Sequence, residues 1–243
     1  MSNNKTYFGV GLPYVDTSDL KGKLIVIEGT DGVGRTTQID NIRKWLEIKG
    51  HGVATTGWAR SRLMSEAIDE AKSGHTLNVQ TYSLLYAADF ADRLENEIIP
   101  ALRAGYIVLA DRYIYTAFAR SVVRGADRKW MQKVFGFALE PDAVFYMKIG
   151  IEDLIPRVIN SETLMKHYWE DEAGEGMDYW ESGMDLNLGE DFYDSFIKYQ
   201  EAVLLEFDRM AKNFNFNVVQ ASKNFEETNK DLKKGISAIL DHG

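Results

Sequence analysis

The residues best suited to chemistry form one glycine-rich segment near the start of the chain. Gly29-Thr30-Asp31-Gly32-Val33-Gly34-Arg35-Thr36-Thr37 directly follows the apolar run Leu24–Ile27. Glycines let a turn bring successive backbone N–H groups toward an anion, and a helix that begins near Thr36 directs the positive end of its dipole to the same place. The spacing is that of a Walker A phosphate-binding loop with arginine in place of lysine. We therefore expect the segment to bind ATP.

Two residues of the segment carry more specific expectations. Thr36 places a hydroxyl where Walker A loops bind Mg²⁺, so it is a candidate metal ligand. A lysine would act as a compact point charge, whereas the guanidinium of Arg35 is a planar fork that can bond two phosphate oxygens. Arg35 is therefore a candidate catalytic residue. Because a misplacement of ~1 Å can slow a reaction on the order of a hundredfold, the sequence predicts ATP binding and leaves the rate of transfer open.

A second polar group, Asp111-Arg112-Tyr113, follows the apolar run Tyr106–Ala110. Ligands of open α/β sheets bind beyond the carboxyl ends of the strands, so we expect these residues beside the glycine-rich segment. Asp111 is a candidate catalytic residue and, with Thr36, a candidate ligand of Mg²⁺. Arg112 is a candidate catalytic residue that would hold a second phosphate. A structural ion pair is the simpler explanation of such a group, but the neighbouring phosphate-binding pattern favours function.

Alternating strands and helices are expected to position these groups. Short apolar runs predict strands at Leu24–Ile27, Gly52–Thr56, Tyr106–Ala110, Ala143–Ile149 and Phe216–Ala221. The stretches between them have helical spacing. One long helix is expected to break near Pro100 and to bury Leu84, Ala88, Ala91, Leu94, Ile98 and Leu102. This order predicts an α/β fold with a parallel sheet and right-handed crossovers.

Length and composition are those of an ordinary globular protein. The chain has 243 residues, of which 45% are hydrophobic and 27% charged, so one domain is expected. No apolar run reaches the roughly 18 residues of a membrane span, and the N-terminus lacks the pattern of a signal peptide. With no cysteine, disulfides are excluded, and we expect a cytoplasmic protein with no membrane partner. The net charge of −9 argues against nucleic acid as a partner.

Two segments stand apart from this pattern. Residues 1–21 precede the first strand and are expected to form an N-terminal extension, and residues 22–243 a single domain. Within that domain, residues 161–191 are rich in acids and glycines and predict a lid-like insertion. A functional flap and a solvated loop both remain open as interpretations of this insertion.

In its motifs and their order, the chain resembles the thymidylate kinase family. The matching segments are Glu28–Gln38, Leu84–Asp89, Ile99–Leu102, Asp111–Tyr113 and Glu140–Asp142. The resemblance implies a three-layer P-loop NTPase fold, with a five-stranded parallel sheet in the order 2-3-1-4-5 and helices on both faces. It also implies ATP and Mg²⁺ as cofactors, a nucleoside monophosphate as phosphate acceptor, with dTMP as the default, and a homodimer.

The resemblance also assigns the acceptor site. Asp31 would approach the acceptor phosphate or sugar hydroxyl, Arg112 would bind the acceptor phosphate, and Tyr86 would stack on the base. Phe90 stands where the family usually has a base-contacting arginine, and Arg120 and Ser121 also depart from the family pattern at acceptor-binding positions. The lid of the family supplies arginines to the transferring phosphoryl group; here the basic candidates are Arg157, Lys166 and His167.

These departures leave three functions open. The leading hypothesis is a kinase that transfers the γ-phosphate of ATP to dTMP. A second keeps the phosphoryl transfer with a different acceptor. A third is an ATP-binding regulatory protein with little turnover, which the arginine at position 35 and the acidic insertion would explain.

Overall fold

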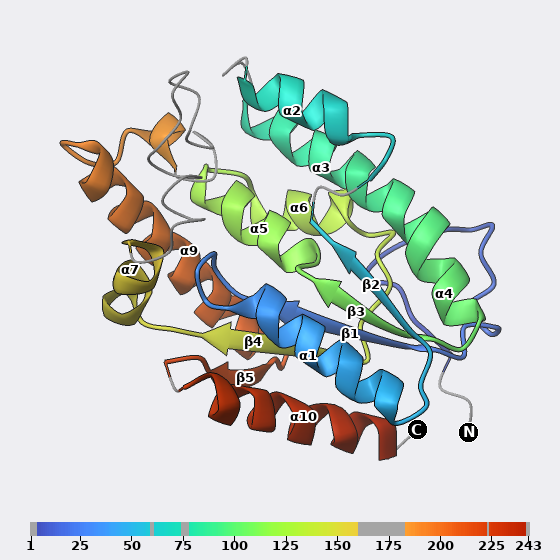
Figure 1. Ribbon diagram of the computed structural model, residues 1–243. Coiled ribbons are helices and arrows are strands. Elements are labelled where there is room, and N and C mark those ends of the chain that lie inside the picture. Colours follow the sequence, from blue (N-terminus) through green and yellow to red (C-terminus); the bar gives the residue numbers. More distant parts are fainter. Residues whose placement is uncertain (1–3, 59–60, 74–77, 160–182, 223, 242–243) are drawn as a thin grey trace.

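In the computed structural model, five parallel strands form one twisted sheet in the order β2-β3-β1-β4-β5 (Figure 1). The structure describes residues 4–58, 61–73, 78–159, 183–222 and 224–241. Central strand β1 pairs with both neighbours, and Val26 lies opposite Ala110 on one side and Val144 on the other. The predicted fold class and strand order are confirmed.

Strands and helices alternate along the chain as the sequence predicts. The elements are β1 (Lys23–Glu28), α1 (Arg35–Ile48), β2 (Val53–Gly57), α2 (Ser65–Ser73), α3 (Val79–Arg93), η1 (Leu94–Ile98), α4 (Ile99–Arg103), β3 (Ile107–Asp111), α5 (Ile114–Val123), α6 (Arg128–Val134), β4 (Ala143–Lys148), α7 (Ile151–Ile159), η2 (Met184–Leu186), α9 (Phe192–Asn213), β5 (Asn217–Gln220) and α10 (Phe225–Asp241).

Both faces of the sheet are covered by helices. Along β1, Leu24 and Val26 belong to one buried cluster, and Ile25 and Ile27 belong to the other. Helices α1 and α10 cover the second cluster, while α3, α4 and α5 cover the first (Figure 1). Burial on both faces explains why the strands are continuous apolar runs rather than alternating ones.

The helical stretch before β3 is broken, as Pro100 predicts. Leu94, Ile98 and Leu102 are buried as expected, but the first part of the stretch buries a different face. A π-helical turn, η1, separates α3 from α4, and Pro100 lies in the first turn of α4. Because proline has no N–H and its ring crowds the preceding turn, a wider turn is a common solution. The expectation that Leu84 and Ala88 are buried is wrong, since both are exposed. Asp89 and Arg93 are buried instead.

Residues 4–21 cross the end of α6 and the loop before β4 (Figure 1). The backbone N–H of Phe8 donates to the carbonyl of Ala138 at 2.8 Å. The Phe8 ring lies 5.4 Å from the ring of Phe214 and 6.4 Å from that of Tyr115, measured between centroids. Aromatic contacts therefore hold this segment on the body of the protein.

Two expectations concern other parts of the chain. Most of the lid-like insertion predicted at 161–191 lies outside the described residues, which resume at 183. Among the helices that the structure describes, none is long and apolar enough to cross a membrane.

Candidate active site

The glycine-rich segment forms a tight turn between β1 and α1. Gly29, Gly32 and Gly34 have φ angles of 155°, 78° and 85°, which side chains other than hydrogen rarely tolerate. At Gly29 a Cβ atom would also lie 3.1 Å from the carbonyl oxygen of Met147. Gly34 is the N-cap of α1, so no capping side chain occupies the N–H groups of the first turn. These features suit an anion bound against the backbone.

The other members of the segment contribute in different ways. Thr30 is buried, and Asp31 is partly buried. The Val33 side chain packs into the core beneath the turn, so only its backbone can face a ligand. Thr36 and Thr37 are exposed at the start of α1.

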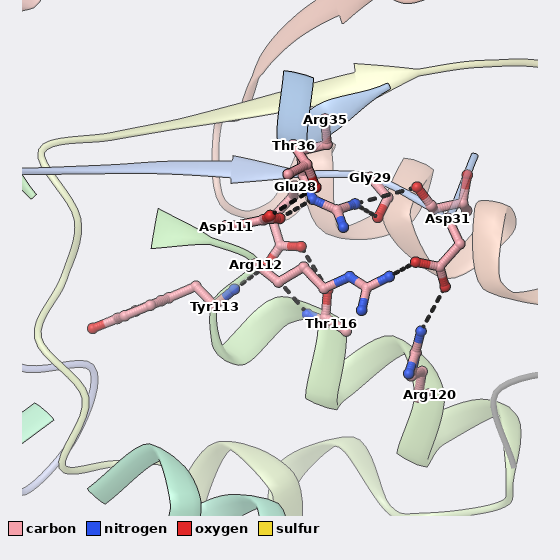
Figure 2. Close-up of polar contacts among 11 residues, drawn as sticks. Glu28, Gly29, Asp31, Arg35, Thr36, Asp111, Arg112, Tyr113, Thr116 and Arg120 are labelled. Carbon is pink, nitrogen blue, oxygen red and sulfur yellow. Dashed lines mark hydrogen bonds and ion pairs between the residues drawn. The ribbon is translucent and has the colours of Figure 1, made fainter. Parts of the chain in front are cut away.

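The Arg35 side chain points into the protein, where it contacts Asp111 and the carbonyl of Gly29 (Figure 2). The sequence predicts instead that it reaches phosphate oxygens. Its Nε donates to Oδ1 of Asp111 in a buried ion pair. Its Nη1 donates to the backbone carbonyls of Gly29 at 2.6 Å and Thr30 at 3.2 Å. The side chain therefore links the glycine-rich turn to the end of β3.

Thr36 and Asp111, the two predicted metal ligands, lie together. The Thr36 hydroxyl donates to Oδ2 of Asp111 at 3.2 Å. A hydroxyl and one carboxylate, completed by substrate phosphates and water, form a donor set that Mg²⁺ commonly takes in phosphoryl-transfer sites. Within the described residues, no group of three or more histidine, cysteine and acidic side chains could hold a metal by itself. The residues fit a metal that is bound mainly through substrate.

A pair of arginines faces the same turn from the other side. Arg112 and Arg120 both form ion pairs with the carboxylate of Asp31, and the Nη2 to Oδ2 distance for Arg120 is 2.9 Å (Figure 2). Both guanidinium groups are more than nine-tenths buried, whereas the Asp31 side chain is 19% exposed. Two buried cations share one carboxylate, so the group carries an excess positive charge that suits a further anion.

The backbone around Arg112 is held in an uncommon conformation. Arg112 has a φ of 68°, and its N–H donates to the carbonyl of Ile27 at 3.0 Å. The next N–H, that of Tyr113, donates to Glu28 Oε1 at 2.8 Å. Positive φ angles in residues other than glycine occur mainly where the surroundings impose them, often in functional sites. The fold therefore orients Arg112 through its backbone.

Glu28 is a functional candidate that sequence reasoning did not identify. Its side chain is fully buried at the end of β1 and accepts from the Thr116 hydroxyl at 2.7 Å (Figure 2). Burial raises the pKa of Glu28 to about 7, although hydrogen bonds from Thr116 and Tyr113 and the charges of Arg35 and Arg112 oppose that rise. The available signal was an acid at the end of an otherwise apolar strand.

The predicted acceptor-binding residues fall into different surroundings. Tyr86 is buried and stacks on Trp58, with ring centroids 4.4 Å apart and planes 17° from parallel. Phe90 lies in the core, where its ring meets Tyr113 edge to face at 4.9 Å. Ser121 is fully buried and accepts a hydrogen bond from the Ser83 hydroxyl at 2.9 Å. The structure brings Arg120 to the glycine-rich turn but does not bring Phe90 or Ser121 there.

A small cavity lies between the glycine-rich turn and helices α5 and α9. Half of the residues that line it are predicted site residues: Gly29, Thr30, Asp31, Arg112 and Arg120. The others were not predicted: Thr116, Tyr199, Gln200, Val203 and Phe207. The helical spacing of α9 indicated a buried face but gave no sign that this face borders the site. Packing of α9 against α5 determines that position.

Two further basic residues are engaged in structural contacts. Arg124 bonds both carboxylate oxygens of Asp185, at 2.8 and 3.0 Å, and donates to the Tyr199 hydroxyl at 2.9 Å. Arg157, a candidate lid cation, donates to the carbonyl of Ala221 at 2.7 Å. The other candidate lid cations, at 166 and 167, lie outside the described residues.

Comparisons with known proteins identify the family of this chain. Residues 27–173 match the sequence model of the family described as Thymidylate kinase. The chain is 32% identical over 225 residues to a probable thymidylate kinase 2 of Saccharolobus solfataricus, covering 92% of this chain and 99% of that protein. It is 26% identical over 220 residues to a probable thymidylate kinase of Pyrococcus horikoshii, covering 88% and 95% of the two chains. These similarities show that the protein belongs to the thymidylate kinase family.

Proposed function

We propose that this protein transfers the γ-phosphate of ATP to dTMP and so forms dTDP and ADP. One observation supports the proposal: a single edge of the sheet holds two groups of hydrogen-bond donors that suit anions. The glycine-rich turn with the N-terminus of α1 forms the first, and Arg112 with Arg120 forms the second. Asp31 belongs to the turn and contacts both arginines, so the two arrangements adjoin. Two adjoining phosphate sites are what transfer between two phosphates requires.

Catalysis in such a site rests on positioning and on neutralisation of charge. The backbone N–H groups of the turn would hold the ATP phosphates, and Arg112 and Arg120 would present the acceptor phosphate. An oxygen of the acceptor phosphate then forms the new bond to the γ-phosphorus as the bond to the β,γ-bridging oxygen breaks and ADP leaves. Thr36 and Asp111 would hold Mg²⁺, which supplies positive charge to the phosphate oxygens.

Arg35 acts in this proposal as a positioning residue for Asp111 and for the turn. Its bonds to Asp111 and to the carbonyls of Gly29 and Thr30 support that role. A guanidinium in this place holds one carboxylate oxygen of Asp111 and leaves the other facing Thr36. In this proposal the positive charge of Arg35 attracts the ATP phosphates across the turn, since the guanidinium bonds the carbonyls of the turn itself.

The test is direct transfer with a panel of acceptors. The purified protein is incubated with ATP, Mg²⁺ and dTMP, dUMP, dCMP or AMP, and diphosphates are separated by anion exchange. We expect dTDP to form fastest, and we expect chelation of the metal to stop transfer. Arg112→Ala should abolish most of the activity, whereas Arg43→Ala on the exposed side of α1 should retain it. Faster transfer to another acceptor, or ATP binding without transfer to any of them, would contradict the proposal.

A homodimer and a cytoplasmic location also remain proposals. The first is supported by the resemblance to the family, and the second by composition and by the class of reaction. Light scattering at micromolar concentration tests the first, because a monomeric mass would exclude it.

A further inference from the structure

Trp58 lies at the same edge of the sheet as the phosphate-binding residues. It directly follows β2, and its backbone N–H donates to the carbonyl of Asp111 at 3.3 Å. That hydrogen bond continues the pairing of β2 with β3 past Gly57. The strand register therefore delivers an indole ring to the active-site edge, where sequence reasoning assigned no role to it.

The indole of Trp58 covers a face of Tyr86. The two rings are nearly parallel, 17° apart, with centroids separated by 4.4 Å. Both side chains are at least nine-tenths buried. A base that stacks on Tyr86 must lie on an open ring face, so Trp58 has to move before the base can enter on this side. A flat, sequence-tolerant surface of this kind is how proteins commonly hold nucleobases.

Arg120 connects this aromatic pair to the anion site. Its guanidinium carbon lies 6.0 Å from the centroid of the Trp58 ring, and its Nη2 bonds Asp31 at 2.9 Å. One guanidinium therefore lies against both the carboxylate of Asp31 and the ring of Trp58 in the stacked pair. An acceptor nucleotide has the same order of groups, with a phosphate at one end and a flat base at the other.

The polar atom of Trp58 gives an independent observation. Its Nε1 is buried and has no hydrogen-bond partner among the described residues. Buried indole N–H groups usually have an acceptor, because an unmet donor in the interior is unfavourable. A carbonyl oxygen on a nucleobase is such an acceptor. An amino group in the same position is not.

We propose that Trp58 is a specificity-determining residue of the acceptor site, which forms a slot with Tyr86 for a pyrimidine base and donates its N–H to a carbonyl of that base. The indole leaves the face of Tyr86, and the base takes the place between the two rings. In this proposal the accepting carbonyl is the one at position 4, so thymine is preferred over cytosine, which has its carbonyl at position 2 and an amino group at position 4. This inference rests on the proposed function, since it names how that site recognises its acceptor.

Two substitutions separate stacking from hydrogen bonding. Trp58→Phe keeps a flat ring and removes the N–H, whereas Trp58→Leu removes both. Trp130→Phe is the matched control, because Trp130 lies on α6 and packs partly against the same core cluster. For each variant, the binding of dTMP and dCMP is measured by calorimetry without ATP, and KM is measured for dTMP and for ATP.

The expected results differ between the variants. Trp58→Phe should lower the preference for dTMP over dCMP about threefold or more, which is the range of one hydrogen bond. Trp58→Leu should raise the KM for dTMP about tenfold or more, as loss of a stacking partner predicts. The KM for ATP and all values for Trp130→Phe should stay at the wild-type level. The dTMP-dependent change in tryptophan fluorescence should persist in Trp130→Phe and disappear in Trp58→Phe.

Several outcomes would overturn the inference. An unchanged affinity for dTMP in a folded Trp58→Leu protein removes Trp58 from the site. Equal increases in the KM of ATP and of dTMP indicate a structural role only. If the wild type binds dTMP in a Trp58-dependent way but transfers no phosphate, the inference stands and the proposed function fails. If the wild type binds neither pyrimidine monophosphate, the inference fails.

Discussion

Loss of the Arg35 guanidinium should destabilise the protein even before ATP is added. Its ion pair with Asp111 joins side chains that are only 8% and 10% exposed, and Nη1 also bonds two backbone carbonyls. Breaking a buried pair by removing one partner typically costs about 3–5 kcal/mol, and the slight exposure favours the lower end. Arg35→Met should therefore lower the free energy of unfolding by about 3 kcal/mol, which is roughly 6–12 °C in melting temperature for a chain of this size.

A double-mutant cycle assigns this loss to the pair itself. Arg35→Met, Asp111→Asn and the double variant are unfolded in urea, and the coupling energy between the two positions should be about 1.5–3 kcal/mol. Arg43 and Glu47 on α1 form a matched control pair, with an exposed contact at 3.3 Å. Their coupling should be only about 0.3–0.5 kcal/mol.

The lysine variant tests the positioning role. Arg35→Lys keeps the charge but offers a single nitrogen, so it should lose about 1–2 kcal/mol of stability and retain measurable phosphoryl transfer. An Arg35→Met protein as stable as the wild type, or a coupling no larger than that of the control pair, would refute the reasoning. Arg35 would then point elsewhere in solution.

Other expectations address the acceptor site, a buried acid and the N-terminal segment. Arg120→Ala should raise the KM for dTMP about tenfold or more and leave the KM for ATP unchanged in steady-state kinetics, because a charge-assisted bond to phosphate is lost; equal changes in both would contradict it. Since burial raises the pKa of Glu28 from 4.5 to about 7, the folded protein binds this proton more tightly than the unfolded chain, and its contribution to stability falls as pH rises between those values. Glu28→Gln should therefore reduce the fall in melting temperature between roughly pH 5 and pH 8. A profile of melting temperature against pH that matches the wild type would contradict the raised pKa of Glu28. Phe8→Ala should lower the free energy of unfolding by about 1–3 kcal/mol in urea, whereas Val10→Ala, whose side chain is 98% exposed, should leave it unchanged; equal effects would show that the Phe8 contacts do not stabilise the fold.

Local patterns were sufficient for the framework of this protein. The strand at Leu24–Ile27 could be predicted because successive side chains of a strand point to opposite faces of the sheet. A strand with only apolar residues therefore has to be buried on both faces. The glycine-rich turn could be predicted because its φ angles demand glycine at defined spacing. The strand order came from the resemblance, since pairing partners lie far apart in the chain and spacing alone does not choose among them.

Helix α3 shows where local patterns stop. Periodicity placed Leu84 on the buried face, but Leu84 is 52% exposed and Asp89 is fully buried. Asp89 accepts from Arg93 at 2.9 Å and from the N–H of Ser61 at 2.9 Å. A charged residue can be buried when hydrogen-bond and ion-pair partners surround it. A hydrophobic pattern in the sequence does not reveal such partners, because they come from other parts of the chain.

A glycine-rich turn ahead of a helix could be predicted from the sequence alone, because glycine spacing and backbone geometry are local properties. The directions of the side chains around that turn could not be predicted in the same way. Arg35 turns toward Asp111, which is 76 positions away, and Trp58 lies on Tyr86 because separate elements deliver the two rings to one place. Directions of this kind depend on contacts between distant segments, and those contacts exist only when the sheet and its helices are assembled.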